Sequence, residues 1–154
     1  MEVINDDVII KKFSELDSKK QKKAFVNALR RGIGILVRQA RANLKKEIPT
    51  ANKVTQKGRF KGLKLINGIT LKVNKAKQAI TAAILKDGRL KWFELGTDLR
   101  RTKQRTKRLT HSTGQIRPIN FFSKAKEQTE PIVFQNINQI IRDSIKKIWD
   151  KQQI

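Results

Sequence analysis

The side chains of this sequence that could take part in catalysis are a group of acids and one histidine. Asp87, Glu94 and Asp98 are neighbours in the sequence, and carboxylates in such a group can hold a magnesium ion in a nuclease. Asp87 begins an Asp-Gly turn, however, and Glu94 and Asp98 flank a glycine, which favours turn formation and local pairing with arginine. His111 stands in a basic segment without an orienting partner, so we interpret it as a solvated surface residue. We therefore predict that the protein is not an enzyme and uses neither a cofactor nor a metal.

The excess of positive charge restricts the function more strongly than any single residue. The 154 residues include 36 Lys and Arg against 13 Asp and Glu, which gives a formal net charge of +23. Residues 18–93 carry 21 of the basic residues and only two acids, Glu47 and Asp87. Nucleic acid, an anionic membrane surface or an acidic protein could each neutralise such a surface, and the charge alone does not choose among them.

Length and composition are typical of a single domain over residues 1–154. Single cores usually form from roughly 100 to 200 residues, and 38% of this chain is hydrophobic. Cysteine is absent, which excludes disulfides and thiolate metal sites. Residues 1–7 are acidic and lack the basic start of a secretory signal, and no apolar run approaches the roughly 20 residues of a membrane span. We expect neither secretory export nor a membrane partner.

Apolar residues at helical spacing predict a short helix over residues 5–16 and a long helix over residues 18–46. The long helix begins with a Ser-x-x-Gln capping box and presents an apolar stripe on one side. Gly32 and Gly34 weaken its interior, which indicates close packing of another element there. The other side carries a basic ridge, of which four residues are candidate contacts to a partner or to DNA: Arg30, Arg31, Arg38 and Arg41.

The middle of the chain predicts a loop followed by a small antiparallel sheet. Residues 48–62 are polar and basic and contain Pro and Gly, which is typical of a mobile loop. Alternating apolar residues predict strands over residues 63–73 and 79–85, joined as a hairpin. A tight Asn-Gly turn inside the first run would instead add a third strand. Residues 90–95 predict a helical turn that places two aromatic side chains in the core, Trp92 and Phe93.

Residues 97–116 form the most unusual segment, because they are long, polar and strongly basic. Six of the nine residues 100–108 are basic, and a loop of this length is usually functional or disordered. We predict a long exposed basic loop that can act as an assembly arm. Residues 121–151 then predict a terminal helix that Pro131 either kinks or restarts. The loop residues that are candidate contacts to a partner or to DNA are Arg100, Arg101, Lys103, Arg105, Lys107 and Arg108.

These elements predict an α+β fold in which a small antiparallel β-sheet packs against the long N-terminal helix and the C-terminal helix, with the long basic loop attached. No repeat or linker divides the chain. Binding of nucleic acid by such a surface would be independent of sequence, because it would use phosphate contacts. Aromatic residues make up only 6% of the chain and Tyr is absent, so we do not expect stacking on single strands.

Two short motifs and the order of the elements resemble a known protein family. The first motif is Trp92-Phe93-Glu94-Leu95-Gly96-Thr97, and the second is Arg117-Pro118-Ile119-Asn120-Phe121-Phe122. The basic helix, loop, hairpin, first motif, variable loop, second motif and closing helix follow one another as in the small neck proteins of long-tailed phages, often called tail-component or tail-completion proteins. The resemblance covers most of the chain, residues 17–151.

The resemblance implies a mechanical function. Copies of such a protein form a ring that completes the head-tail joint, or the tail end, through which DNA passes. The implied partners are other copies of the chain, connector or portal-side proteins and tail proteins, with non-specific contact to DNA. The implied location is the neck or tail of the virion, after assembly in the host cytoplasm. Whether the basic loop contacts DNA or acidic protein stays open, and the alternative function is a sequence-independent DNA- or RNA-binding accessory protein.

The residue types in the two motifs suit structural roles. Gly96 permits a turn that a residue with a Cβ would resist, and Thr97 can cap a turn. Glu94 would be a buried or half-buried acceptor for backbone groups of the loop or for Arg117. The residues of the second motif that end the loop and anchor the terminal helix in the core are Pro118, Phe121 and Phe122.

Overall fold

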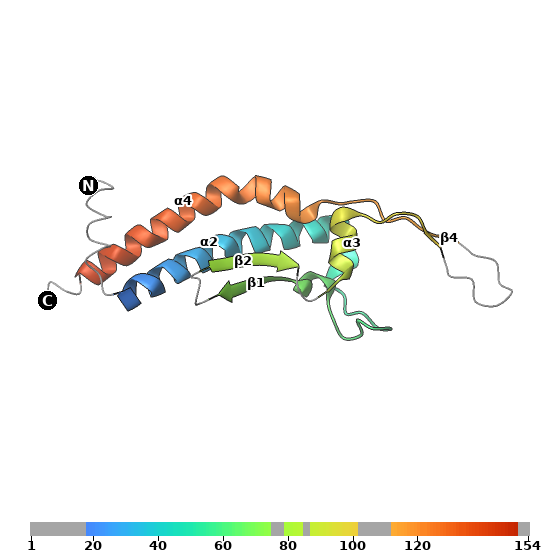
Figure 1. Ribbon diagram of the computed structural model, residues 1–154, viewed down its shortest axis with the longest axis horizontal. Helices are drawn as coiled ribbons and strands as arrows, with labels where there is room; N and C mark the ends of the chain where they lie inside the picture. The colour runs from blue at the N-terminus through green and yellow to red at the C-terminus, as the bar shows by residue number, and fades with distance from the viewer. Residues whose placement is uncertain (1–17, 75–78, 85–86, 102–111, 151–154) are drawn as a thin grey trace. The chain divides into compact units, whose positions relative to one another are not determined.

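A computed structural model describes residues 18–74, 79–84, 87–101 and 112–150. The helix that we predict over residues 5–16 lies outside the described residues. In the described chain, two long helices and one short helix accompany two separate two-stranded sheets (Figure 1). The order of the helices and strands along the chain agrees with the sequence pattern, and the differences lie in the connecting segments.

Long helices and a small sheet form the framework of the fold (Figure 1). Helix α2 (Ser18–Glu47) and helix α4 (Phe121–Asp150) pack against the sheet of strands β1 (Ile69–Asn74) and β2 (Ala79–Ile84), which are antiparallel. The predicted α+β fold is thereby confirmed, and α2 extends one residue beyond the predicted end. Apolar stripes drive this packing because each long helix buries one face.

Contacts along the chain group its residues in two compact units. Among the described residues, the first unit combines 18–36, 71–74, 79–82 and 129–150, and the second combines 37–70, 83–84, 87–101 and 112–128. Each unit therefore contains part of both long helices and part of the hairpin. The buried apolar residues of the first unit, within the described chain, are Ala24, Ala28, Ile80 and Ile145.

Close packing of α2 in the first unit depends on one glycine. A Cβ at Gly32 would overlap Cγ1 of Ile137 and lie 3.4 Å from the carbonyl oxygen of Val133, both in α4. Gly32 therefore lets the two helices approach closely, as its position in the sequence predicts. For Gly34 the same prediction is wrong, because no atom lies within 4 Å of the place of its Cβ.

The second unit contains the irregular elements, and all candidate motif residues belong to it. Two short 3-10 turns, η1 (Pro49–Asn52) and η2 (Leu65–Gly68), precede the hairpin, and helix α3 (Arg89–Leu95) follows it. A Cβ at Gly68 would lie 2.5 Å from Cδ1 of Leu90, so η2 packs directly on α3. The buried apolar residues of this unit are Val37, Ala40, Leu44, Ala51, Leu65, Ile69, Leu90, Phe121 and Ala125.

The first strand is shorter than its sequence pattern predicts. Residues 65–68 form η2, and Lys64 contributes a single bridge to Val54, so β1 begins only at Ile69. The alternative tight turn with a third strand is also not formed. Gly68 is buried against Leu90, and this contact accounts for the tight 3-10 turn in place of an extended chain.

The prediction that Trp92 lies in the core is wrong. Leu90 and Glu94 face inwards from α3 and are 0% and 7% exposed, whereas Trp92 is 47% exposed. Residues two apart on a helix point to nearly opposite sides, and α3 has only seven residues with one buried face. Phe93 is half-buried.

Pro131 neither restarts nor ends the terminal helix, because α4 continues through it to Asp150. A proline removes one backbone hydrogen bond to the residue four positions earlier, here Glu127. Both Pro131 and Glu127 are exposed, so water can reach the carbonyl group that loses its partner.

The base of the predicted loop over residues 97–116 forms a ribbon and not a loop. Strand β3 (Arg100–Arg101) pairs antiparallel with strand β4 (Ser112–Gly114), with Arg100 opposite Gly114 and Arg101 opposite Ser112. Backbone hydrogen bonds between the two sides hold this base in an extended form, which the polar composition did not indicate. Residues 102–111 lie outside the described chain.

Candidate functional site

The two motifs lie side by side in the second unit and are joined by main-chain hydrogen bonds. We call the joined segments, residues 93–97 and 116–123, the clasp. The amide of Thr97 donates to the carbonyl of Ile116 at 2.9 Å, and the amide of Ile116 donates to Oγ1 of Thr97 at 3.1 Å. These two hydrogen bonds close the base of the β3–β4 ribbon, which leads away from α3 (Figure 1).

Gly96 is the residue that allows the two sides of the clasp to approach. Its φ of +77° lies in the region that favours glycine. A Cβ there would also lie 2.9 Å from the carbonyl oxygen of Ile116 and 2.9 Å from Cδ of Pro118. One residue further along, the amide of Ile119 donates to the carbonyl of Phe93 at 2.8 Å. Both conformation and space therefore require glycine at this position.

Glu94 joins α3 to the first turn of α4. Its side chain is only 7% exposed. Oε2 accepts from the amide of Phe122 at 2.8 Å, and Oε1 accepts from the amide and the hydroxyl of Ser123 at 2.9 and 2.7 Å. The first amides of a helix have no partner within the helix, and a carboxylate there also interacts favourably with the helix dipole.

Glu94 is thus the buried acceptor that we expected, but the expected donors were wrong. Its partners belong to the start of α4, whereas Arg117 is exposed. The reason is geometric: α3 directs position 94 towards the two amides that have no partner inside α4. Pro118 is also exposed, while Phe121 is fully buried and Phe122 is half-buried.

A polar contact fixes the start of α4 to the end of α2 within the second unit. Nδ2 of Asn43 donates to the carbonyl of Phe121 at 3.2 Å and to Oε1 of Gln128 at 3.2 Å. Nε2 of Gln39 donates to the same oxygen of Gln128 at 3.1 Å. Together with Glu94, these side chains determine where α4 begins relative to α2 and α3 in this unit.

The candidate arginines of α2 fall into two groups. Arg30, Arg31 and Arg38 are exposed and remain candidates for contact with a partner. Arg41 is half-buried, and its Nη2 donates to the carbonyl of Ile69 at 2.7 Å. Arg41 therefore links α2 to the start of β1 inside the second unit.

The candidate residues of the arm are only partly described. Arg100 is exposed on β3, and Arg101 continues that strand. The remaining candidates lie outside the described residues, namely Lys103, Arg105, Lys107 and Arg108. His111, interpreted above as a surface residue, lies outside them as well.

An ion pair between a buried carboxylate and a half-buried guanidinium lies at the start of α3, in agreement with the local pairing with arginine that we predict for Asp87. Asp87 is 2% exposed, and its Oδ2 lies 2.6 Å from Nη2 of Arg89. The hydrogen bonds that its guanidinium donates to Asp87 are the main cause that raises the pKa of Arg89 above its ordinary value, so the guanidinium stays charged. The same guanidinium donates to Oγ1 of Thr55 at 3.1 and 3.2 Å and lies 4.4 Å from the ring centroid of Phe60.

Arg89 thereby holds an ordered hairpin that we call the basic finger, residues 53–64. Thr55 donates its amide to the carbonyl of Leu63 at 3.0 Å and accepts from the amide of Gly62 at 2.9 Å. Gly58 and Gly62 have φ values of +80° and +81°, which make the turns of the finger. Residues 48–62 lack regular strands and long helices, as predicted, but contain the 3-10 turn η1 and hydrogen-bonded turns; the mobility of this segment stays a prediction. Hydrogen bonds and Arg89 order this polar segment without an apolar core.

Two of the three carboxylates that could form a magnesium site have structural partners. Asp87 is paired with Arg89, and Glu94 binds the start of α4, while Asp98 is exposed. Among the residues that the structure describes, no three His, Asp or Glu side chains are grouped so that they could hold a metal ion. In the same residues, no helix has the length and apolar character needed to span a membrane.

The clasp and the basic finger are thus the two places in the second unit where hydrogen bonds join segments that are distant in the sequence. The arm begins at the clasp. In the clasp, Glu94 accepts from Phe122, which lies 28 positions away in the sequence. In the finger, Arg89 donates to Thr55, which lies 34 positions away. Comparisons of the chain with protein-family models, with curated proteins and with solved structures find no match.

Proposed function

We propose that the protein is a structural virion protein of the phage neck, a ring subunit that completes the head-tail joint or the tail end through which DNA passes. The observation that carries the proposal is the clasp. The two motifs on which the family resemblance depends are separated by the 19 residues 98–116, yet Gly96, Thr97 and Glu94 contact the second motif or its neighbours directly. Two motifs that contact each other in the folded chain support the family resemblance more specifically than two short sequence matches taken separately.

The clasp suits a subunit that must present an arm in a fixed direction. Thr97 and Ile116 close the base of the ribbon, and Glu94 fixes that base to the start of α4. Arg100 and Arg101 begin the arm directly above this base. An arm with an ordered base loses less conformational entropy when it binds a neighbour than a fully flexible loop does.

The charge of the chain also supports an assembly with obligatory partners. Copies that each carry a net charge of +23 repel one another in a ring unless anions neutralise them. DNA phosphates or acidic connector and tail proteins would supply this neutralisation, in a neck assembled in the host cytoplasm. Cofactors and catalysis have no part in the proposed function.

Reconstitution of the joint tests the proposal. In the test variant, the basic residues of 100–108 are replaced by Ser and Gln, and we expect loss of particle assembly or of DNA retention. A control variant loses the same number of charges elsewhere, at exposed lysines of α2 and α4: Lys20, Lys22, Lys23, Lys124, Lys126 and Lys146. Normal assembly and DNA retention by the arm variant would contradict the role of the arm, and failure of the unaltered chain to join particles would contradict the neck assignment.

The alternative is a sequence-independent DNA- or RNA-binding accessory protein. The observation that favours it is the absence of Asp and Glu between Glu47 and Asp87, a stretch that includes the whole basic finger. Such a protein would bind free duplex tightly, with affinity that falls steeply as salt rises. A ring subunit would instead co-purify with connector or tail proteins from infected cells, which separates the two functions.

A further inference from the structure

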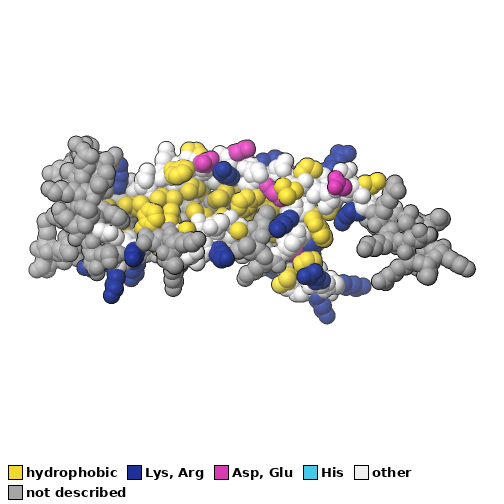
Figure 2. Space-filling view, viewed as in Figure 1, with side chains coloured by type: hydrophobic (Ala, Val, Ile, Leu, Met, Phe, Trp, Pro, Cys, Tyr) yellow, Lys and Arg dark blue, Asp and Glu magenta, His cyan; other side chains and the backbone are white. Residues whose placement is uncertain are grey.

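The basic finger carries several lysine and arginine side chains that take no part in the ion pair of Asp87 with Arg89. Lysines and arginines are concentrated in it, and no acid occurs in it or on either side of it between Glu47 and Asp87. In the space-filling view, Lys and Arg side chains gather at its tip, below α3 (Figure 2). Lys64 is half-buried, and the exposed bases of the finger are Lys53, Lys57, Arg59 and Lys61.

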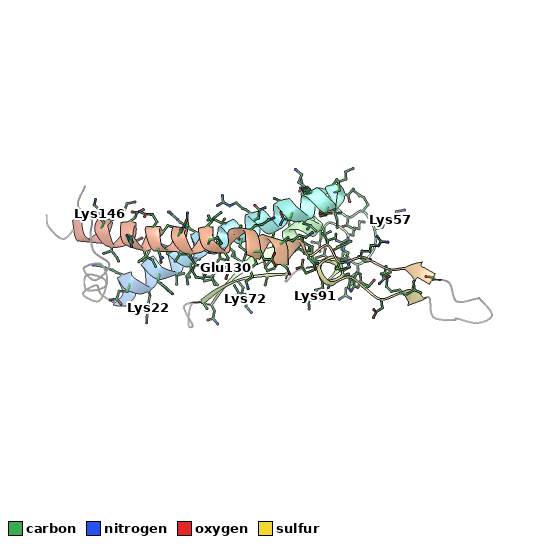
Figure 3. The ribbon with its side chains drawn as sticks, turned by 90° about the horizontal axis from the view of Figure 1, so that it is seen from above. Lys22, Lys57, Lys72, Lys91, Glu130 and Lys146 are labelled. Carbon is green, nitrogen blue, oxygen red and sulfur yellow. The ribbon has the colours of Figure 1, made fainter. Side chains whose placement is uncertain are left out.

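None of these bases forms an ion pair within the described part of the chain. The contrast with Arg89 is direct, because Arg89 lies at the base of the same finger and is neutralised by Asp87. Lys57, labelled in Figure 3, is exposed. The cations of the finger are therefore available to an external anion.

Hydrogen bonds and a cation–π contact connect the finger to itself and to α3. Its two sides are joined by the hydrogen bonds of Thr55 with Leu63 and Gly62 and by the single bridge of Val54 with Lys64, and Arg89 contacts both Thr55 and the ring of Phe60. At the tip, the backbone amides of residues 57–59 form no hydrogen bond with the described chain. Ordered amides beside several cations are a favourable arrangement for phosphate oxygens.

The composition of the finger favours nucleic acid over an acidic protein as the source of these anions. Protein interfaces are depleted in lysine and concentrate their binding energy in buried aromatic residues. The exposed tip is mainly lysine, and the single aromatic residue, Phe60, is already covered by the guanidinium of Arg89. Contacts with the phosphate backbone depend instead on Lys, Arg and backbone amides.

We infer that the basic finger, residues 53–64, is a binding site for the phosphate backbone of duplex DNA, independent of base sequence. This site is separate from the arm and from the exposed arginines of α2, and the inference does not depend on the neck assignment. In a neck, it would place ordered cations against the passing duplex. In an accessory protein, it would supply part of the affinity for free duplex.

Fluorescence anisotropy with a short labelled duplex tests the inference on the full chain. The test variant is Lys57→Gln, Arg59→Gln and Lys61→Gln. The control variant, Lys124→Gln, Lys126→Gln and Lys146→Gln, loses the same charge from exposed positions of α4, of which Lys146 is labelled in Figure 3. Circular dichroism verifies that both variants keep their helices.

We expect the finger variant to lose about tenfold or more in affinity relative to the control variant. Each phosphate contact contributes about 0.9 to the slope of log affinity against log salt. The slope of the finger variant should therefore be lower by about 2.7, while that of the control variant stays near the original value.

Two outcomes would overturn the inference. One is equal affinity and equal salt slope for the finger variant and the control variant, because the finger would then add only general charge. The other is unchanged duplex binding together with specific loss of binding to poly-glutamate, which would assign the finger to an acidic protein. Failure of the neck reconstitution leaves this measurement unaffected, since it uses only the protein and free duplex.

Discussion

At the scale of single residues, Glu94 has the largest set of contacts for one side chain in the clasp. It satisfies two amides of the first turn of α4 and also accepts from the hydroxyl of Ser123. A capping contact of this kind usually contributes about 1 kcal/mol, and hydrogen bonds to a charged group contribute about 1.5–3 kcal/mol. The stability of the clasp should therefore depend measurably on this carboxylate.

We expect Glu94→Ala to lower the free energy of unfolding by about 2 kcal/mol, because two amides of the first turn of α4 lose a charged acceptor at a partly buried site. Glu94→Gln keeps one acceptor oxygen and should lose about half of that amount. Urea unfolding followed by circular dichroism measures both changes. The control is Glu127→Gln, an exposed acid of α4 for which we expect a change within about 0.5 kcal/mol. Equal effects of Glu94→Ala and the control would show that the cap is not stabilising.

At the scale of secondary structure, the two glycines of α2 separate helix propensity from helix packing. Gly34→Ala should raise the free energy of unfolding by about 0.5–1 kcal/mol, because alanine favours the helix and no atom lies within 4 Å of the new Cβ. Gly32→Ala gains the same propensity but meets the side chain of Ile137, and overpacking costs about 1–3 kcal/mol. We therefore expect Gly32→Ala to be destabilising in the same urea measurement.

The pair also tests whether α2 and α4 pack closely in the first unit. If Gly32→Ala is as stabilising as Gly34→Ala, the contact with Ile137 is too loose to matter, and the packing described here is wrong. A second substitution, Ile137→Ala together with Gly32→Ala, removes the obstacle. We therefore expect Gly32→Ala to be less destabilising in a chain that already carries Ile137→Ala than in the original chain. The variant with Ile137→Ala alone is the reference for this comparison.

The elements differ in how far the sequence predicts them, and the reason is the range of the interactions. Periodicity over many residues predicted α2 almost to its last residue, because each turn repeats the same apolar side. The order of the finger depends instead on Arg89 reaching Thr55, 34 positions away. No local pattern records such a contact. The glycines of the turns, Gly58 and Gly62, were the only local signal, and the polar composition of the segment favoured a loop.

The site residues show the same division. The turn at Gly96 could be predicted because its conformation is local, whereas the donors of Glu94 could not, because they lie 28 positions or more away. Trp92 was misplaced for another reason. A short helix buries one narrow face, and hydrophobicity alone does not tell which residues lie on it: Leu90 and Glu94 are buried, whereas Trp92 is 47% exposed.

At the scale of the whole molecule, a net charge of +23 should make stability depend on ionic strength. Like charges on a folded chain repel one another more than they do in the extended unfolded chain. Between about 0.01 M and 0.1 M salt, the Debye length falls from about 30 Å to about 10 Å, so the repulsion is largely screened. These concentrations are low enough that general effects of salt on hydrophobic burial remain small.

We therefore expect the midpoint of thermal unfolding to rise between these two concentrations. A gain of about 1 kcal/mol corresponds to about 2–4 °C for a chain of this size. The variant with Lys124, Lys126 and Lys146 replaced by Gln carries three fewer charges at exposed positions. It should have a higher midpoint than the original chain at low salt and a smaller rise. A midpoint that is independent of salt in both chains would show that the charges are already neutralised within the fold, and the argument for obligatory anionic partners would then fail.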